Sequence, residues 1–169
     1  MTGRRPTAFC NLSSAAESAG GGGTSSLRSR GELPSPTTQI YVVDTMGELG
    51  LVYRLASAVF IGGSLVKHGG QNPIEAAKLS TAILHGPHVW NFGEIYAALD
   101  SARGAETVES IDRLTAHFAA WLADPDARAR AAEEAGIVVR NLGGALDRTL
   151  ASLDPYLMEL QLRKRVHDA

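Results

Sequence analysis

The chain of 169 residues is short of several features that would assign it to a special class. Its one cysteine, Cys10, excludes a scaffold of intrachain disulfides and is compatible with a reducing compartment. It has no run of the roughly 18 to 20 consecutive apolar residues that a membrane-spanning helix requires, so an integral membrane protein is not expected. The formal net charge of −2 leaves no excess of positive charge, and no nucleic-acid partner is expected.

What is present is the composition of one globular domain, with 44% hydrophobic and 20% charged residues. Residues 1–26 differ from the rest, because they have few large apolar side chains, no regular spacing of them, and the glycine run Gly20–Gly23. Such a segment cannot bury enough apolar surface to offset the entropy of ordering it. We therefore expect a disordered tail at 1–26 and a folded domain at 27–169.

From Ile40 onward, short apolar runs alternate with segments of helical spacing. Apolar or β-branched runs predict strands at residues 40–43, 58–61, 82–84 and 106–108. Apolar spacing, proline positions and capping residues predict helices at residues 48–57, 73–79, 92–102, 110–124, 127–140 and 144–162. Ser110 opens one of them, and Asp124 can cap the next from Pro125 onward. Because such alternation implies right-handed crossovers between parallel strands, we predict an α/β fold with a doubly wound parallel sheet.

Ligands of such sheets bind beyond the carboxyl ends of the strands, which directs attention to the loops after Val43, Ile61 and Leu84. The candidate binding residues in the first two of these loops are Met46, Gly47, Glu48, Gly69, Gly70, Asn72 and Glu75. Glycines before a helix let a phosphate approach backbone N–H groups, and a carboxylate accepts hydrogen bonds from a ribose. The alternative of a plain strand-to-helix turn, with a capping residue and a charge matched to the helix dipole, stays open.

Three histidines, His68, His85 and His88, raise the question of a zinc site. They lie on two different loops, with no cysteine nearby and no pair spaced for one helix face, so no metal site is expected. The sequence also has no Walker loop, nucleophile elbow or CxxC pair, and no cofactor is expected. Trp90 and Phe92 are interpreted as hydrophobic anchors.

Four segments, in this order and spacing, resemble the C-terminal half of the 3-deoxy-D-manno-octulosonic acid (Kdo) transferases of lipopolysaccharide assembly. They are RSRGE at 28–32, IYVVDTMGELG at 40–50, VFIGGSLVKHGGQNPIE at 59–75 and GPHVWNFGEI at 86–95. The likeness runs from about Leu27 to about Tyr156.

The resemblance implies a glycosyltransferase of the GT-B class, built from two Rossmann-like domains. Members of this family, the lipid IVA Kdo transferases, transfer Kdo from CMP-Kdo to a lipid A precursor at the cytoplasmic face of the bacterial inner membrane, with inversion and without a metal. Carried over to this chain, the loop Met46–Glu48 contacts CMP, and Asn72 and Glu75 contact its phosphate or ribose side.

The resemblance does not extend to the family's N-terminal domain, with its acceptor site, membrane-associating segment and catalytic carboxylate, or to the first part of the C-terminal domain. We therefore expect a partial donor-binding domain from a truncated or frameshifted gene, soluble or poorly folded alone, inactive alone and without a catalytic residue of its own. Two alternatives stay open: a fragment of another GT-B nucleotide-sugar transferase or of an epimerase, and a non-catalytic nucleotide-binding fragment.

Overall fold

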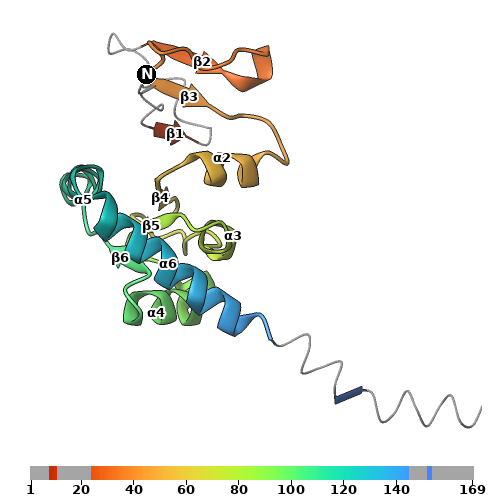
Figure 1. Ribbon diagram of the computed structural model, residues 1–169, viewed down its shortest axis with the longest axis vertical. Coiled ribbons are helices and arrows are strands. Elements are labelled where there is room, and N and C mark those ends of the chain that lie inside the picture. Colours follow the sequence, from red (N-terminus) through yellow and green to blue (C-terminus); the bar gives the residue numbers. More distant parts are fainter. Residues whose placement is uncertain (1–7, 11–23, 145–151, 154–169) are drawn as a thin grey trace, which may run out of the picture.

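The structure is a computed structural model that describes residues 8–10, 24–144 and 152–153 (Figure 1). Its strands are β1 (Ala8–Cys10), β2 (Ser25–Leu27), β3 (Ile40–Val42), β4 (Ala58–Ile61), β5 (Ala82–His85) and β6 (Ala105–Thr107). Its α-helices are α2 (Leu49–Leu55), α3 (Ile74–Lys78), α4 (Gly93–Ser101), α5 (Ile111–Ala123) and α6 (Pro125–Leu142). Two short 3-10 helices, η1 (Arg28–Arg30) and η2 (Trp90–Phe92), precede β3 and α4.

The predicted α/β architecture is confirmed, and every described strand pairing is parallel. The predicted caps are also observed: the Ser110 hydroxyl accepts the Arg113 N–H at 3.2 Å, and Asp124 Oδ1 accepts the Ala127 N–H at 2.9 Å. Helix α6 begins at Pro125, directly after its cap Asp124 as expected, because a proline in the first turn loses no helical hydrogen bond. The helix predicted at 144–162 falls outside the described residues at all but three positions.

The strands form two sheets of three, in the orders β1-β3-β2 and β4-β5-β6. Strand β3 pairs with β1 on one side and with β2 on the other, so both of its edges are occupied and neither is left for β4. Figure 1 shows α2 lying between the two sheets. The alternation of strands and helices therefore predicted the parallel strands correctly without showing that they divide into two sheets.

One strand falls within the stretch 1–26 that was predicted to be disordered, and a second begins there. Residues Ala8–Cys10 form β1, and β2 begins at Ser25 and crosses the predicted boundary. The physical reason is that strand pairing uses backbone N–H and C=O groups, which small residues supply as well as large ones. Residues 1–7 and 11–23 lie outside the described residues, and the division of the chain at residue 26 stays a prediction.

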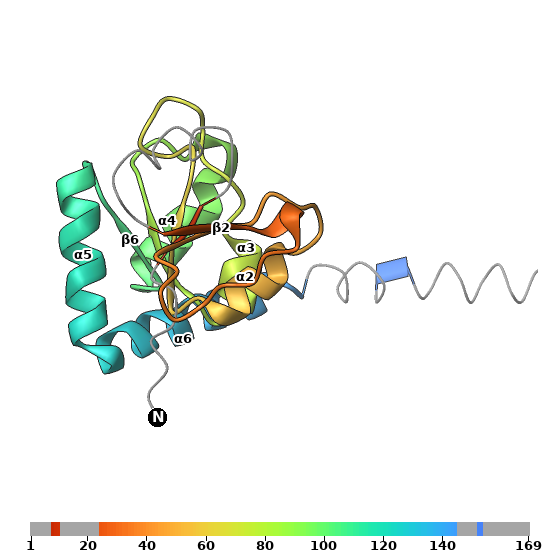
Figure 2. The ribbon, with the colours of Figure 1, turned by 90° about the horizontal axis from the view of Figure 1, so that it is seen from above.

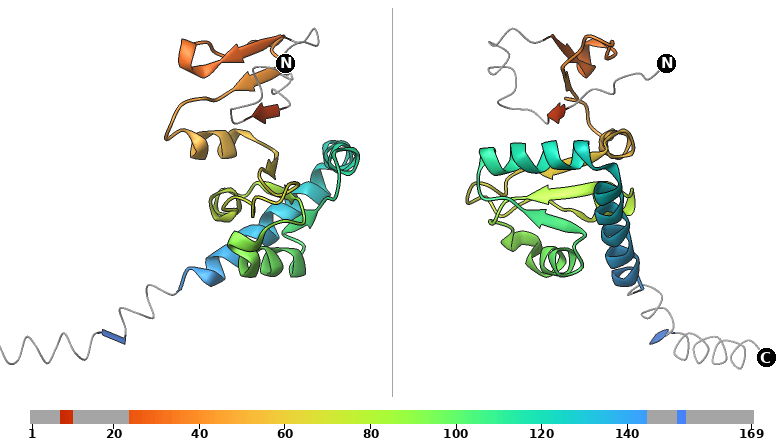
Figure 3. Two further views of the ribbon diagram at one scale, coloured as in Figure 1. Left: turned by 180° about the vertical axis from the view of Figure 1, so that it is seen from behind. Right: turned by 60° about the vertical axis from the view of Figure 1, so that its left-hand side comes forward.

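Strand β5 is fully buried at the centre of the second sheet, and its side chains alternate between two apolar clusters. Ile83 packs in a cluster completed by α2, α3, α4 and the second half of α6. Leu84 packs in the other, completed by α5 and the first half of α6. Figure 3 (right) shows this sheet between α5 on one face and α4 on the other, which is the two-sided cover expected of a doubly wound sheet.

Helix α6 crosses this sheet at the amino ends of its strands. A Cβ atom added to Gly104, directly before β6, would lie 2.6 Å from the backbone nitrogen of Ala135, so the helix and the strand meet backbone to backbone. Figure 2 shows the loops that follow β4 and β5 at the opposite end of the sheet.

Within the described part of the chain, no helix is long and apolar enough to cross a membrane.

Candidate functional site

The loop after β3 is fastened to η1 by two carboxylates. Glu48 accepts hydrogen bonds from Arg28, with Nη2 to Oε1 at 2.6 Å and Nε to the two carboxylate oxygens at 3.0 and 3.1 Å, and also from the Thr45 hydroxyl. Asp44 Oδ1 accepts the Ser29 N–H at 2.8 Å. The carboxylate of Glu48 is therefore engaged within the protein, and its direct effect is to hold the loop.

The same contacts shift the pKa values of the charged groups in the loop after β3 and in η1. The hydrogen bonds from Arg28, and then from Thr45, hold the pKa of Glu48 below its ordinary value of 4.5, and the bond from Ser29 lowers the pKa of Asp44. In return, the Glu48 carboxylate raises the pKa of Arg28. At neutral pH the loop thus carries two carboxylate charges, one of them paired with a guanidinium group.

The tip of this loop is open to solvent. The Met46 side chain is 98% exposed. Gly47 has a φ of +84°, and nothing lies within 4 Å of the position that a Cβ would take there. Because L side chains are strained at that φ, glycine is favoured at Gly47 by the turn itself, and its backbone is accessible to a ligand.

The loops after β4 and β5 are bound to each other through Ser64. The buried Ser64 hydroxyl donates to the Ile61 carbonyl at 2.5 Å and accepts the Gly86 N–H at 2.8 Å. The Ser64 carbonyl accepts the His88 N–H at 2.9 Å, and a Cβ on Gly86 would lie 2.2 Å from that same oxygen. The two loops therefore form one rigid unit at the carboxyl end of the sheet.

The glycines Gly69 and Gly70 are buried within this unit, with φ values of +100° and +74°. A Cβ on Gly69 would lie 2.4 Å from Nδ2 of Asn91, and a Cβ on Gly70 would lie 3.2 Å from Cγ1 of Val89. The Gly69 carbonyl also accepts the Asn91 N–H at 3.1 Å. These two glycines face the neighbouring loop, so both their positive φ values and loop packing require glycine.

The start of α3 lies beside α2. Asn72 Oδ1 accepts the N–H of Ile74, the first residue of α3, at 2.9 Å, which is the turn-forming role left open by the sequence. Glu75 is exposed, and its Oε1 lies 3.0 Å from the position that a Cβ on Gly50 of α2 would take. The structure therefore brings Glu75 next to the helix that follows Met46, Gly47 and Glu48.

His85 occupies the end of β5 and has a partner for each ring nitrogen. Its Nδ1 lies 2.8 Å from the Gly86 carbonyl oxygen and its Nε2 lies 2.9 Å from Oδ1 of Asp100. The centroid of its ring lies 4.4 Å from the ring centroid of Tyr96. The Tyr96 hydroxyl donates to the Gln71 carbonyl at 2.7 Å. His85 thus joins β5 to α4 under the loops, and the described residues contain no group of three side chains suited to hold a metal.

Sequence reasoning assigned no role to the residues that hold these loops in place: Arg28, Ser64, Asn91 and His85. Arg28 and Glu48 are 20 residues apart, and Asn91 and His68, whose carbonyl it also contacts, are 23 apart. The one sequence feature that could have indicated such a role is the segment RSRGE at 28–32, because its first arginine, Arg28, forms the ion pair with Glu48.

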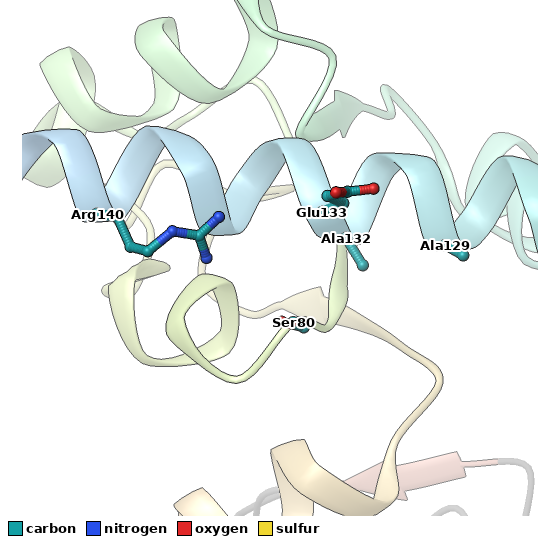
Figure 4. Close-up of a pocket in the computed structure, with 5 residues that line it drawn as sticks. All are labelled: Ser80, Ala129, Ala132, Glu133 and Arg140. Atoms are coloured by element: carbon teal, nitrogen blue, oxygen red, sulfur yellow. The ribbon is translucent and has the colours of Figure 1, made fainter.

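A separate hollow of about 400 Å³ lies at the other end of the sheet (Figure 4). It is lined by Ser80 before β5 and, from α6, by Ala129, Ala132, Glu133 and Arg140. None of the candidate residues at the carboxyl ends of the strands contributes to it. We therefore do not assign ligand binding to this hollow, because ligands of open parallel sheets bind at the opposite end.

No family model matches the chain, but comparison with known proteins finds similar sequences. The chain is 40% identical over 131 residues to the 3-deoxy-D-manno-octulosonic acid transferase of Haemophilus influenzae, an alignment that covers 77% of this chain and 31% of that protein. It is 35% identical over 126 residues to the transferase of the same name from Bordetella pertussis, covering 73% of this chain and 29% of the relative. The chain thus spans about a third of the length of these curated relatives.

A solved structure is similar in fold. The C-terminal CMP-Kdo binding domain of WaaA from Acinetobacter baumannii matches with a TM-score of 0.66 and 31% sequence identity, over 69% of this chain and 61% of that domain. At this level of identity the likeness concerns both sequence and fold. The arrangement of parallel strands and covering helices described above is therefore similar to part of that domain.

Proposed function

We propose that this chain, which is related to the Kdo transferases over 77% of its length, acts as the part of such an enzyme that binds the donor CMP-Kdo. The observation that carries the proposal is the match of its fold and sequence to a CMP-Kdo binding domain. The loops after β3, β4 and β5 lie at the carboxyl ends of parallel strands, where nucleotides bind in doubly wound folds.

Within that site, the seven residues predicted from the sequence take two kinds of role. Met46, Gly47 and Glu75 are exposed and offer a side chain or a backbone to the nucleotide. A carboxylate such as that of Glu75 accepts hydrogen bonds from a ribose diol, and the open backbone at Gly47 admits a phosphate.

The other four of the seven residues shape the surface around the ligand. Glu48 holds the loop of Met46 and Gly47 through Arg28, and Asn72 fixes the turn into α3. Gly69 lets the loop after β4 pack against Asn91, and Gly70 lets it pack against Val89. This division explains why glycine, asparagine and glutamate occur together in the two loops.

Transfer of Kdo to a lipid A precursor would need parts of the relatives that this chain does not match. A hydroxyl acceptor requires a positioned base, and rate enhancement requires both substrates to be held together, an effect worth about 7 to 11 kcal/mol in favourable cases. Glu48 is engaged by Arg28, and Glu75 lies on the proposed donor side. The proposal therefore places the acceptor site, the base and the contact with the inner membrane in the unmatched part of the relatives, and assigns no transfer activity to this chain alone.

Calorimetric titration tests the donor site. CMP should bind the chain and UDP should bind at least about tenfold more weakly, a difference of about 1.4 kcal/mol. Glu75→Ala and Gly47→Val should each weaken CMP binding, by loss of the carboxylate and by strain at the positive φ. Glu133→Ala, an exposed carboxylate on α6 at the other end of the sheet, is the matched control and should bind CMP like the unchanged chain.

Three results would contradict the proposal: no binding of CMP by the folded chain, unchanged affinity in both site variants, or equal affinity for UDP, which would favour another GT-B nucleotide-sugar protein. Transfer is tested separately by incorporation of labelled Kdo into a lipid A precursor. The chain alone should give none, and turnover by it would require a base among its own carboxylates.

A further inference from the structure

The two edges of the sheet β4-β5-β6 differ in chemistry. At the β6 edge, Glu106 carries a charge that pairs with His117 of α5 at 2.7 Å, and Thr107 is exposed. Charged and polar residues of this kind protect an edge from pairing with another chain. Strand β4, with the sequence AVFI, has no charged or polar side chain, and among the described residues it pairs with β5 alone.

Strand β4 also has the side chains of an interior strand. Val59 packs against the cluster that contains Ile83, whereas Phe60 packs against the cluster that contains Leu84. Strands that are apolar on both faces are typical of positions inside a parallel sheet, with a neighbour on each side. The residues Ala58, Val59 and Phe60 remain only partly buried here.

Helix α2, which leads into β4, has a second apolar face. Tyr53 packs into the core, while Leu51 and Leu55, four residues apart and on the other side of the helix, are 53% and 50% exposed. Figures 1 and 3 show α2 beside β4, on the side toward the first sheet. A helix with apolar residues on both sides is expected to be covered on both sides.

The order of strands in doubly wound folds indicates what belongs there. In the common order, the third and fourth strands along the chain are separated in the sheet by the first two. Strand β3 leads through α2 into β4 without pairing with it, as the third strand leads into the fourth in that order. This chain covers 61% of the matched CMP-Kdo binding domain, so part of that domain is unmatched. The unmatched part is the candidate source of the intervening strands.

We propose that the free edge of β4, together with Leu51 and Leu55 of α2, binds in trans the part of a Kdo transferase donor domain that this chain does not match. The partner supplies a parallel strand beside Ala58–Ile61 and apolar side chains that cover the exposed face of α2. This inference rests on the same similarity as the proposed function, but it requires no nucleotide.

The test uses the full 169-residue chain and, as probe, the unmatched part of the Acinetobacter baumannii CMP-Kdo binding domain, produced separately as a soluble fusion. Without any nucleotide, the probe should bind and should slow amide hydrogen exchange in β4 and α2 at least about tenfold. The double variant Leu51→Glu/Leu55→Glu should bind at least about tenfold more weakly. Leu122→Glu on α5 is the matched control, since Leu122 is 54% exposed, and it should bind normally.

Several outcomes would overturn the proposal. One is a folded chain, as judged by circular dichroism, that shows neither binding nor new protection in β4. Another is equal weakening by Leu122→Glu. Protection of β4 that rises with concentration of the chain alone would assign the edge to a second copy. Protection at every concentration without the probe would assign it to residues of the chain itself. Because the assay contains no nucleotide, failure to bind CMP would leave this inference standing.

Discussion

The two sheets of the molecule are stabilised by different forces. In the sheet β4-β5-β6, every residue of the central strand is buried, and helices cover both faces. In the sheet β1-β3-β2, the buried apolar side chains of β2 and β3 are Tyr41 and Val42 alone. The sheet β4-β5-β6 is a scaffold built by apolar burial, whereas the sheet β1-β3-β2 depends on polar contacts.

Those polar contacts join particular residues of β2, β3 and the segment between them. The Tyr41 hydroxyl donates to the Glu32 carbonyl at 3.0 Å, and Glu32 Oε2 accepts the Leu27 N–H at 2.7 Å. The hydroxyl oxygens of Ser26 and Thr38 lie 3.2 Å apart. Polar contacts of this kind add little free energy but fix geometry, so the comparison teaches that one sheet provides stability while the other orients the loop of Met46 and Gly47.

The largest effect is expected from the scaffold. Leu84→Ala removes a fully buried side chain from β5 and should lower the free energy of unfolding by about 2 to 5 kcal/mol. Leu27→Ala, at a partly buried position of β2, should cost less than half as much. Urea denaturation followed by circular dichroism measures both. Equal losses would show that the two sheets contribute equally to the free energy of unfolding and would contradict the contrast drawn between them.

A smaller effect is expected at the contact between β6 and α6. In Gly104→Ala the new Cβ would lie 2.6 Å from the nitrogen and 2.7 Å from the Cα of Ala135, so backbone must move, at a cost of about 1 to 3 kcal/mol. Gly93→Ala, at the start of α4 with nothing within 4 Å of its Cβ position, is the control and should be neutral or slightly stabilising. A thermal midpoint that falls in both variants alike would argue against this contact.

The smallest effect on global stability is expected in the polar sheet, from Arg28→Met. Arg28 holds the pKa of Glu48 below 4.5 in the folded protein. The contribution of the Arg28–Glu48 pair to folding stability is therefore fully present above pH 4.5, and it is lost as the pH falls through the lower pKa of Glu48 in the folded state. In Arg28→Met the titration of Glu48 should therefore move up toward 4.5, while amides of β5 stay unchanged. Carboxyl carbon shifts in NMR measure this, and identical titration curves with and without Arg28 would refute the assignment.

The sequence predicted the elements of the scaffold well, for a physical reason. Apolar residues are dense there, so their spacing identifies β4, β5, α5 and α6, and short-range capping by Ser110 and Asp124 marks helix starts. Strands β1 and β2 were missed because AFC and SSL offer no apolar period. Their pairing with β3 depends on backbone groups, which every sequence contains.

The places of the candidate loops after β3, β4 and β5 were predictable from the sequence, but the contacts within them were not. For Asn72 the sequence left a turn-forming role and a ligand-binding role open, and the structure shows the turn-forming contact. The roles of Glu48, Gly69 and Gly70 depend on Arg28 and Asn91, which are distant in the chain, and no local pattern encodes such pairs. Which of the seven residues contact a nucleotide stays a prediction.

The place of α6 has a consequence for how the chain is made. Ala131, Ala132, Ala135 and Val139 of this helix complete both apolar clusters, although β4, β5 and β6 leave the ribosome well before it. Until α6 emerges, the nascent sheet is uncovered at Gly104 and along much of β5. Since domains fold as units during synthesis, translation must proceed past Val139 before the scaffold closes, and pauses upstream of that point would prolong its exposure to chaperones and proteases.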